Sequence, residues 1–158
     1  MLIDFMFDET NFREFAMRTT DVGTSNENAN YTNDDSDIEP CKKELCRLFM
    51  AVEQSPVSIV MTDIDGTIEY VNKAFIDITG YSPGEVLGQN PKILQSKLTP
   101  KERFDQLWSA ITQGNRWKGE LVNKKKSGEV YWESAEISPI KNKNGTITGF
   151  VGIKEDIT

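Results

Sequence analysis

The chain has 158 residues, with 18 Lys and Arg, 25 Asp and Glu and no histidine, and its formal net charge is −7. Hydrophobic residues make up 37% and charged residues 27%, as in an ordinary soluble protein. Because histidine is absent, the chain cannot build a Ser-His-Asp or Cys-His triad, an imidazole metal site or a histidine-ligated haem. The two cysteines, Cys41 and Cys46, are five residues apart, which places them on different faces of a helix and suits neither a disulfide nor a metal site.

The charge is unevenly distributed. Residues 1–40 contain ten acidic and two basic residues, whereas residues 41–158 contain 15 acidic and 16 basic ones. The one basic triplet, 124–126, precedes Ser127-Gly128 and fits a hairpin tip, so we predict no nucleic-acid partner. No apolar run reaches the ~18 residues that span a bilayer, and the start of the sequence is not a signal peptide. We therefore expect a cytoplasmic protein without a membrane span.

Three segments follow from composition and periodicity. Residues 1–40 are predicted to be an acidic, largely disordered segment, because residues 19–40 have too few apolar side chains to form a core; a short amphipathic helix is expected within 1–18. Residues 41–55 are predicted to form a flanking helix, and residues 56–158 the folded domain. The apolar stripe of that helix has the spacing i, i+3, i+4, i+7: Leu45, Leu48, Phe49 and Val52.

The domain itself begins with a predicted hairpin. Residues 57–63 and 67–71 read as strands, joined at Asp65-Gly66. Two short helices are expected over 73–79 and 83–87, each ended by a glycine. Thr99-Pro100-Lys101-Glu102 predicts a helix start, with Thr99 as N-cap and Glu102 completing a capping box.

The C-terminal half is predicted to be mainly strands. Residues 117–125, 129–140 and 146–156 form three of them, with turns at Ser127-Gly128 and Asn144-Gly145. Together with the first hairpin they predict an α+β fold, a five-stranded antiparallel sheet with helices on one face.

The order of these elements and several short motifs resemble PAS domains. Residues 64–75 (IDGTIEYVNKAF) resemble the PAS opening, residues 79–88 (TGYSPGEVLG) its helical middle, and residues 117–128, with Ser138-Pro139 and 155–158, its C-terminal half. The resemblance covers about residues 42–158 and implies the PAS fold and a sensory role.

Within that family, residues 88–95 (GQNPKILQ) are similar to the flavin-contacting segment of LOV photoreceptors. The photoactive cysteine of LOV domains is replaced by Pro91, so the LOV photoadduct cannot form. The chain is more similar to the flavin-binding redox PAS domains of nitrogen-fixation and methane-oxidation regulators. That resemblance implies FAD as cofactor, FMN being the other flavin to consider, with Trp108 and Asn123 contacting the ring.

The residues themselves are compatible with a flavin. Strand alternation places Asn123 with Trp117 and Leu121 on the sheltered face, away from Lys118, Glu120, Val122 and Lys124 on the wetter one. Its carboxamide can both donate to and accept from the pyrimidine edge of a flavin. The alternative is that Asn123 bonds backbone groups in an empty core, and Trp108 can likewise be a core residue.

Two further positions depart from the LOV pattern. Glu133 stands where LOV domains use Asn, and Lys154 where they use the Gln near flavin N5. If both side chains point inward they should form an ion pair beside the cofactor, since neither can be buried alone, and Lys154 would favour an anionic reduced flavin. The alternative is that both tips extend to solvent. Asn90 and Gln95 are candidates for contacts on the ribityl or phosphate side.

No catalytic constellation is present, so we interpret the chain as a sensor rather than an enzyme. We expect it to bind FAD and to sense redox state or oxygen for an effector such as a diguanylate cyclase or histidine kinase. A homodimer through the 41–55 helix and the outer sheet face, including Trp132, is expected. Two alternatives remain: a cofactor-free dimerisation or interaction module, and a pocket for another small ligand.

Overall fold

A computed structural model describes the backbone of residues 38–158 and the side chains of residues 43–158. The helix expected within residues 1–18, and the disorder expected up to residue 37, lie outside the described residues. The first described helix, α2 (Ile38–Glu53), overlaps the predicted flanking helix and begins three residues earlier.

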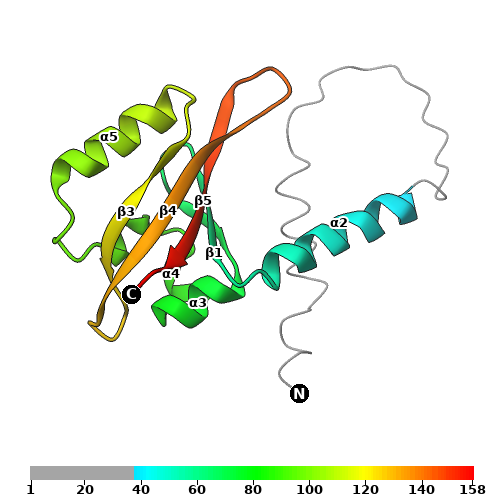
Figure 1. Ribbon diagram of the computed structural model, residues 1–158. Helices are drawn as coiled ribbons and strands as arrows, with labels where there is room; N and C mark the ends of the chain where they lie inside the picture. Colours follow the sequence, from blue (N-terminus) through cyan, green and yellow to red (C-terminus); the bar gives the residue numbers. More distant parts are fainter. Residues whose placement is uncertain (1–37) are drawn as a thin grey trace. The chain divides into compact units, whose positions relative to one another are not determined.

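The centre of the fold is one antiparallel sheet of five strands in the order β2-β1-β5-β4-β3 (Figure 1). The strands are β1 (Ser58–Asp63), β2 (Ile68–Val71), β3 (Trp117–Lys124), β4 (Val130–Lys141) and β5 (Ile147–Asp156). The chain thus has the α+β fold that the sequence predicts, with strand ends within one residue or so of the expected positions. The central position of β5 brings the C-terminal strand between β1 and β4.

The first hairpin turns at the predicted position. Asp63 Oδ1 accepts hydrogen bonds from the backbone N–H groups of Asp65 and Thr67, at 2.9 and 2.8 Å. Gly66 has φ +83°, a conformation that glycine adopts without steric cost. A Cβ at this position would lie 3.1 Å from the Trp108 ring, so glycine also permits a close approach to that side chain.

Besides α2, which precedes β1, four helical elements lie between β2 and β3. Three are short, α3 (Lys73–Thr79), α4 (Pro83–Val86) and the 3₁₀ turn η1 (Pro91–Leu94), and the longer helix α5 (Lys101–Thr112) follows them. Their buried side chains form two apolar clusters. One joins β1 and β2 to α3, α4 and η1 through Val60, Ile68, Val71, Phe75, Val86 and Leu94. The other joins α5 to β3, β4 and β5 through Leu107, Ile111, Trp117, Leu121, Ala135 and Phe150.

The apolar stripe of α2 is divided between two environments. Phe49 packs edge-on against Tyr70 of β2, with ring centroids 5.9 Å apart, and the Asn72 amide donates to the Val52 carbonyl. Leu45 and Leu48, in contrast, are 39% and 58% exposed. The helix therefore packs on its own domain with its C-terminal half.

The predicted start of α5 is wrong in its details. Pro100 occupies the N-cap position without a side-chain hydrogen bond, and the Thr99 hydroxyl bonds Val122 on β3 instead. It accepts from the Val122 N–H at 2.8 Å and is 3.3 Å from the Val122 carbonyl, to which it donates. β3 is an edge strand whose outward backbone groups need partners. At Val122 the Thr99 hydroxyl accepts from the N–H, and the Ser96 hydroxyl also donates to the carbonyl. The prediction that Val122 lies on the wetter face is therefore wrong, since its side chain is buried.

Candidate functional site

A pocket of about 570 Å³ lies between α5, η1 and the inner face of the sheet. Its volume falls within the ~300–1,000 Å³ range of small-molecule sites. Both apolar clusters contribute to its walls through Val60, Leu107, Trp108, Ile111, Leu121 and Phe150. The space between the Trp108 helix and the sheet is therefore not filled by the protein's own side chains.

Five of the six sequence-predicted site residues line this pocket: Asn90, Gln95, Trp108, Asn123 and Lys154. They come from η1 and its flanks, α5, β3 and β5, and so are brought together by the fold rather than by the sequence. The sixth, Glu133, is bonded to two of them. Pro91, at the position of the LOV cysteine, also lines the pocket.

Trp108 is both a core and a pocket residue. Its ring lies edge-on to Phe150, with centroids 5.9 Å apart and an interplanar angle of 88°. It packs against the apolar cluster of α5 while part of its surface lines the pocket. The two interpretations of this residue are therefore compatible.

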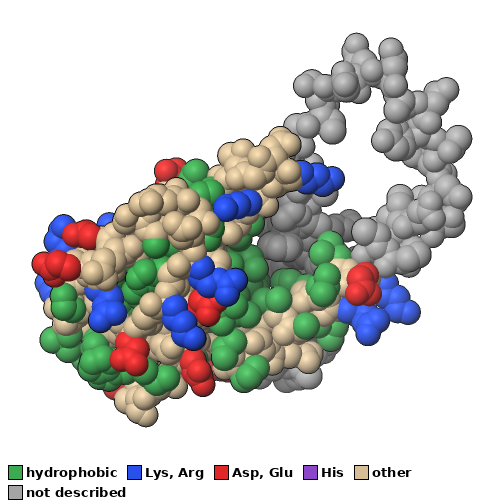
Figure 2. All heavy atoms as spheres, turned by 45° about the horizontal axis from the view of Figure 1, so that its top comes forward, with side chains coloured by type: hydrophobic (Ala, Val, Ile, Leu, Met, Phe, Trp, Pro, Cys, Tyr) green, Lys and Arg blue, Asp and Glu red, His purple; other side chains and the backbone are tan. Residues whose placement is uncertain are grey.

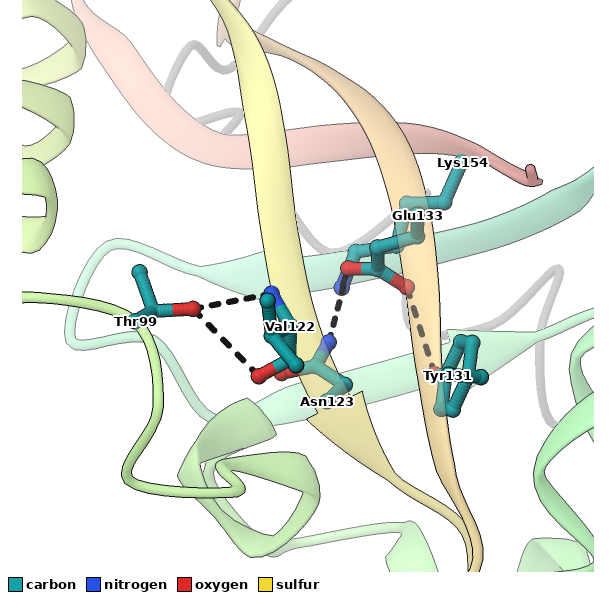
Figure 3. Close-up of polar contacts among 6 residues, drawn as sticks. All are labelled: Thr99, Val122, Asn123, Tyr131, Glu133 and Lys154. Atoms are coloured by element: carbon teal, nitrogen blue, oxygen red, sulfur yellow. Dashed lines mark hydrogen bonds and ion pairs between the residues drawn. The ribbon is translucent and has the colours of Figure 1, made fainter. Parts of the chain in front are cut away.

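The sheet side of the pocket carries a buried polar network (Figure 3). Lys154 Nζ and Glu133 Oε1 are 2.9 Å apart, and Asn123 Nδ2 donates to the same oxygen at 2.8 Å. The Tyr131 hydroxyl donates to the other carboxylate oxygen, Oε2, at 3.2 Å. The predicted Glu133–Lys154 ion pair is thus confirmed, and the alternative in which both tips reach solvent is wrong, since Glu133 is 3% and Lys154 7% exposed.

The register of three strands explains this cluster. Asn123 on β3 is paired with Tyr131 on β4, and Ala135 on β4 with Lys154 on β5. Glu133, two residues from both Tyr131 and Ala135, is therefore a diagonal neighbour of Asn123 and of Lys154 on the same face. Three donors on one carboxylate offset part of the desolvation that burying a charge costs.

Tyr131 is the member of the network that the sequence did not single out. It is 2% exposed, and burial, reinforced by the Glu133 charge and hydrogen bond, raises the pKa of Tyr131 well above its usual value. The signal available in the sequence was alternation: Tyr131 and Glu133 are two residues apart on one strand and must share a face.

Asn90 and Gln95 have different surroundings. Asn90 Oδ1 accepts from the Lys92 N–H at 3.1 Å, and its Nδ2 donates to the Gly66 carbonyl at 3.1 Å. Its amide thus joins η1 to the first hairpin, a structural role the sequence did not predict. Gln95 forms an isolated antiparallel bridge with Asn123, which fixes the backbone at the pocket's edge.

Beside these residues, the rim of the pocket carries basic side chains. Lys92, Lys97 and Lys101 line it, and Lys97 has φ +67°, in the left-handed region. A hydrogen bond from Lys101 to Asp105, at 2.9 Å, raises the pKa of Lys101. The pocket therefore combines apolar walls, an amide and ammonium on its sheet side, and positive charge at its edge.

Other chemistry is not evident in the part of the chain that the structure describes. Among residues 43–158 no three His, Cys, Asp or Glu side chains gather as metal ligands. Over the described helices, none is long and apolar enough to cross a membrane. On the face shown in Figure 2, basic, acidic and hydrophobic side chains are intermixed, without a continuous basic surface.

The comparisons with known proteins agree on one family. The sequence model described as PAS domain matches residues 56–158. The nitrogen fixation regulatory protein of Klebsiella oxytoca is 36% identical over 110 residues, which are 70% of this chain and 22% of that protein. The chain thus spans about a fifth of that relative's length.

Two solved structures have the same fold. The PAS domain of a Colwellia psychrerythraea protein has a TM-score of 0.67 and 30% identity, and the match covers 73% of this chain and 98% of that one. The LOV domain from the Erythrobacter litoralis EL346 blue-light activated histidine kinase has a TM-score of 0.62 and 30% identity, with 66% and 98% covered.

Proposed function

Since the chain belongs to the PAS domain family, we propose that it is the sensory module of a signalling protein and that its pocket binds a flavin. The observation that carries the proposal is the pocket between Trp108 and the sheet, with apolar walls and with Asn123 and Lys154 on its sheet side. Ligand sites of this kind are mainly apolar, with a few polar groups that fix orientation. A planar ring with one polar edge matches that description.

The residues present fit such a ring. The apolar walls suit the faces of an isoalloxazine, and the Trp108 and Phe150 rings provide aromatic surface. Asn123 and Lys154, which line the pocket, would hold its polar edge. Gln95 and the rim lysines would hold its ribityl and phosphate end. A phosphate among lysines is favourable for either flavin, and we propose FAD, as the resemblance to redox PAS domains implies.

We propose redox state or oxygen as the signal. Pro91 lines the pocket where LOV domains place their cysteine, so this chain offers no thiol at that position. A bound flavin would supply reversible uptake of electrons and protons. Lys154, held by Glu133 at 2.9 Å, would stabilise negative charge at the ring edge, and only groups that bond the two states differently can transmit the change.

The output of this sensor would pass through the same strands. Trp132, next to Glu133 on β4, faces away from the pocket, and its backbone bonds the C-terminal residues Ile157 and Thr158. We propose that this outer face and the exposed Leu45 and Leu48 of α2 form contacts with a second copy. An effector such as a histidine kinase or diguanylate cyclase would receive the signal.

The proposal is tested by the absorption spectrum of the purified chain, before and after flavin addition and gel filtration. Retained flavin bands in the near-ultraviolet and blue are expected. Bleaching by dithionite, with reversal by air and no lasting effect of blue light, would support redox sensing. A colourless protein after flavin addition would contradict the proposal.

That negative result would favour a second candidate, a cofactor-free interaction module. The observation behind it is the group of large apolar side chains left exposed on β4, on β5 and just beyond it: Val130, Trp132, Ile153 and Ile157. Such groups mark interaction sites when they are contiguous. The spectrum therefore separates the two functions.

A further inference from the structure

The Asn123 side chain is held in one orientation by its neighbour on β4. Its Nδ2 donates to Glu133 Oε1 at 2.8 Å. A carboxylate only accepts hydrogen bonds, so the amide nitrogen and not the amide oxygen must face Glu133. Figure 3 shows the Asn123 nitrogen turned toward Glu133.

Glu133 is in turn fixed from two other sides. Lys154 Nζ is 2.9 Å from the same oxygen that Asn123 bonds, and the Tyr131 hydroxyl donates to the other oxygen at 3.2 Å. Both neighbours are donors, which require an acceptor between them. All four side chains are more than nine-tenths buried, so water cannot readily replace these contacts.

The amide oxygen of Asn123 consequently faces the pocket. This oxygen has no hydrogen-bond partner among the described residues. Among those residues, every side-chain oxygen or nitrogen that is fully buried does have a partner. The Asn123 oxygen is therefore not fully buried and must border open space. Asn123 is 3% exposed and lines the pocket, so that space is the pocket.

Lys154 places a donor beside this acceptor. An ammonium group has three N–H donors. Among the described residues Lys154 uses one of them, in its contact with Glu133. Lys154 also lines the pocket. Because Asn123 Nδ2 and Lys154 Nζ bond the same Glu133 oxygen, the pocket wall has an acceptor and a cationic donor side by side.

We propose that Glu133 is a positioning residue that determines which ligand edge this pocket accepts. By holding the Asn123 nitrogen, it presents the amide oxygen and the Lys154 ammonium together. The matching ligand edge has an N–H group next to a carbonyl or anionic acceptor, as an imide or pyrimidinedione does. This inference rests on the proposed flavin function, in which the flavin N3–H would donate to Asn123.

The test compares the affinities of riboflavin and N3-methylriboflavin for the full chain, measured by fluorescence titration. A site built around an N–H donor discriminates strongly against an analogue that lacks it. The wild type is expected to bind riboflavin about 100-fold more tightly. In Glu133→Gln the Asn123 amide is free to rotate by 180°, because the new side chain can both donate and accept. The ratio of the two affinities should then fall about 10-fold, as expected for the loss of one hydrogen bond.

Two variants control for other effects. Glu136 is on β4 like Glu133, but on the opposite face, where it forms an ion pair with Arg116. Glu136→Gln removes this pair and should leave the ratio unchanged. Glu133→Gln leaves the Lys154 ammonium buried without a counter-charge, so this single variant can fold poorly. The double variant Glu133→Gln/Lys154→Met removes that charge and is expected to show the same loss of discrimination between the two flavins.

The outcomes separate the two claims. Wild-type binding with an unchanged ratio in both Glu133 variants would overturn the positioning role and leave the flavin site standing. Absence of binding of riboflavin, N3-methylriboflavin and FAD to the wild type would overturn the flavin function and this inference with it.

Discussion

Lys154 on β5 and Glu133 on β4 form an ion pair of 2.9 Å whose two side chains are both more than nine-tenths buried. A buried pair of this kind contributes little net stability, because desolvation of the charges offsets their attraction, but removing one partner leaves an uncompensated charge. The pair lies at the pocket, which Lys154 lines.

Lys154→Met should lower the free energy of unfolding by about 3–5 kcal/mol, because Glu133 is left buried without its cation. The double variant Glu133→Gln/Lys154→Met should recover most of that loss. Urea denaturation of the three proteins measures both effects, and a double variant less stable than Lys154→Met would contradict the explanation.

The same lysine should influence a bound flavin. Lys154→Gln keeps the side chain polar but removes the charge that favours an anionic reduced ring, so the midpoint potential should fall by about 30–60 mV, equivalent to ~1.4–2.8 kcal/mol for a two-electron couple. Dithionite titration with reference dyes measures the potential. An unchanged potential and spectrum would show that Lys154 does not act on the ring.

Gly66 offers a test of the pocket's geometry. Gly66→Ala forces a side chain into φ +83° and places a Cβ 3.1 Å from Trp108, so both stability and flavin affinity should decrease, stability by more than about 1 kcal/mol. Gly145→Ala has a similar φ of +80° with open space around the Cβ. Gly145→Ala should therefore lose stability but keep the wild-type flavin affinity. Equal flavin affinities for the two variants would argue against a ligand beside Gly66.

The Thr99 hydroxyl stabilises the edge of β3 rather than the start of α5. Thr99→Val should cost about 1–3 kcal/mol, because the buried Val122 N–H loses its acceptor, and should accelerate hydrogen exchange at the Val122 amide. Thr99→Ser should retain the wild-type protection. The comparison variant Thr112→Val removes a hydroxyl on α5 itself that bonds the Trp108 carbonyl. Loss of protection confined to the first turn of α5 in Thr99→Val would restore the capping interpretation.

Because of Tyr131, the free energy of unfolding should decrease at alkaline pH. Burial and the Glu133 charge raise its pKa in the folded protein, so the folded state holds this proton more tightly than the unfolded state. The stabilisation is therefore complete below the unfolded pKa of about 10 and is lost as the pH rises above it. Tyr131→Phe should flatten part of the fall in unfolding free energy above pH ~10 and reduce the tyrosinate absorbance that accompanies unfolding. The same slope in both proteins would exclude this origin.

The fold was predictable because its signals are local. Alternation, the glycine turns and the apolar stripe of α5 identify strands and helices to within a residue or two. The sequence also indicated that Glu133 and Lys154 would pair if both pointed inward, since neither charge can be buried alone. That both do point inward is shown only by the structure.

What could not be predicted depends on tertiary neighbours. Thr99 matches a helix cap in sequence, but the free edge of β3 competes for its hydroxyl and is visible only once the strand order is known. Asn90 carried no sign that its amide would bond Gly66, 24 residues away. The direction of the Asn123 amide likewise depends on Glu133, which lies on the next strand.

The central claim, a flavin between the Trp108 helix and the sheet, is tested most directly by FAD titration of three proteins followed by fluorescence anisotropy. Leu121→Trp fills the pocket from its sheet wall, whereas Glu120→Trp puts the same ring on the opposite, exposed face. Saturable one-to-one binding is expected for the wild type and Glu120→Trp, and none for Leu121→Trp. No binding to the wild type, or equal binding to all three, would contradict the claim.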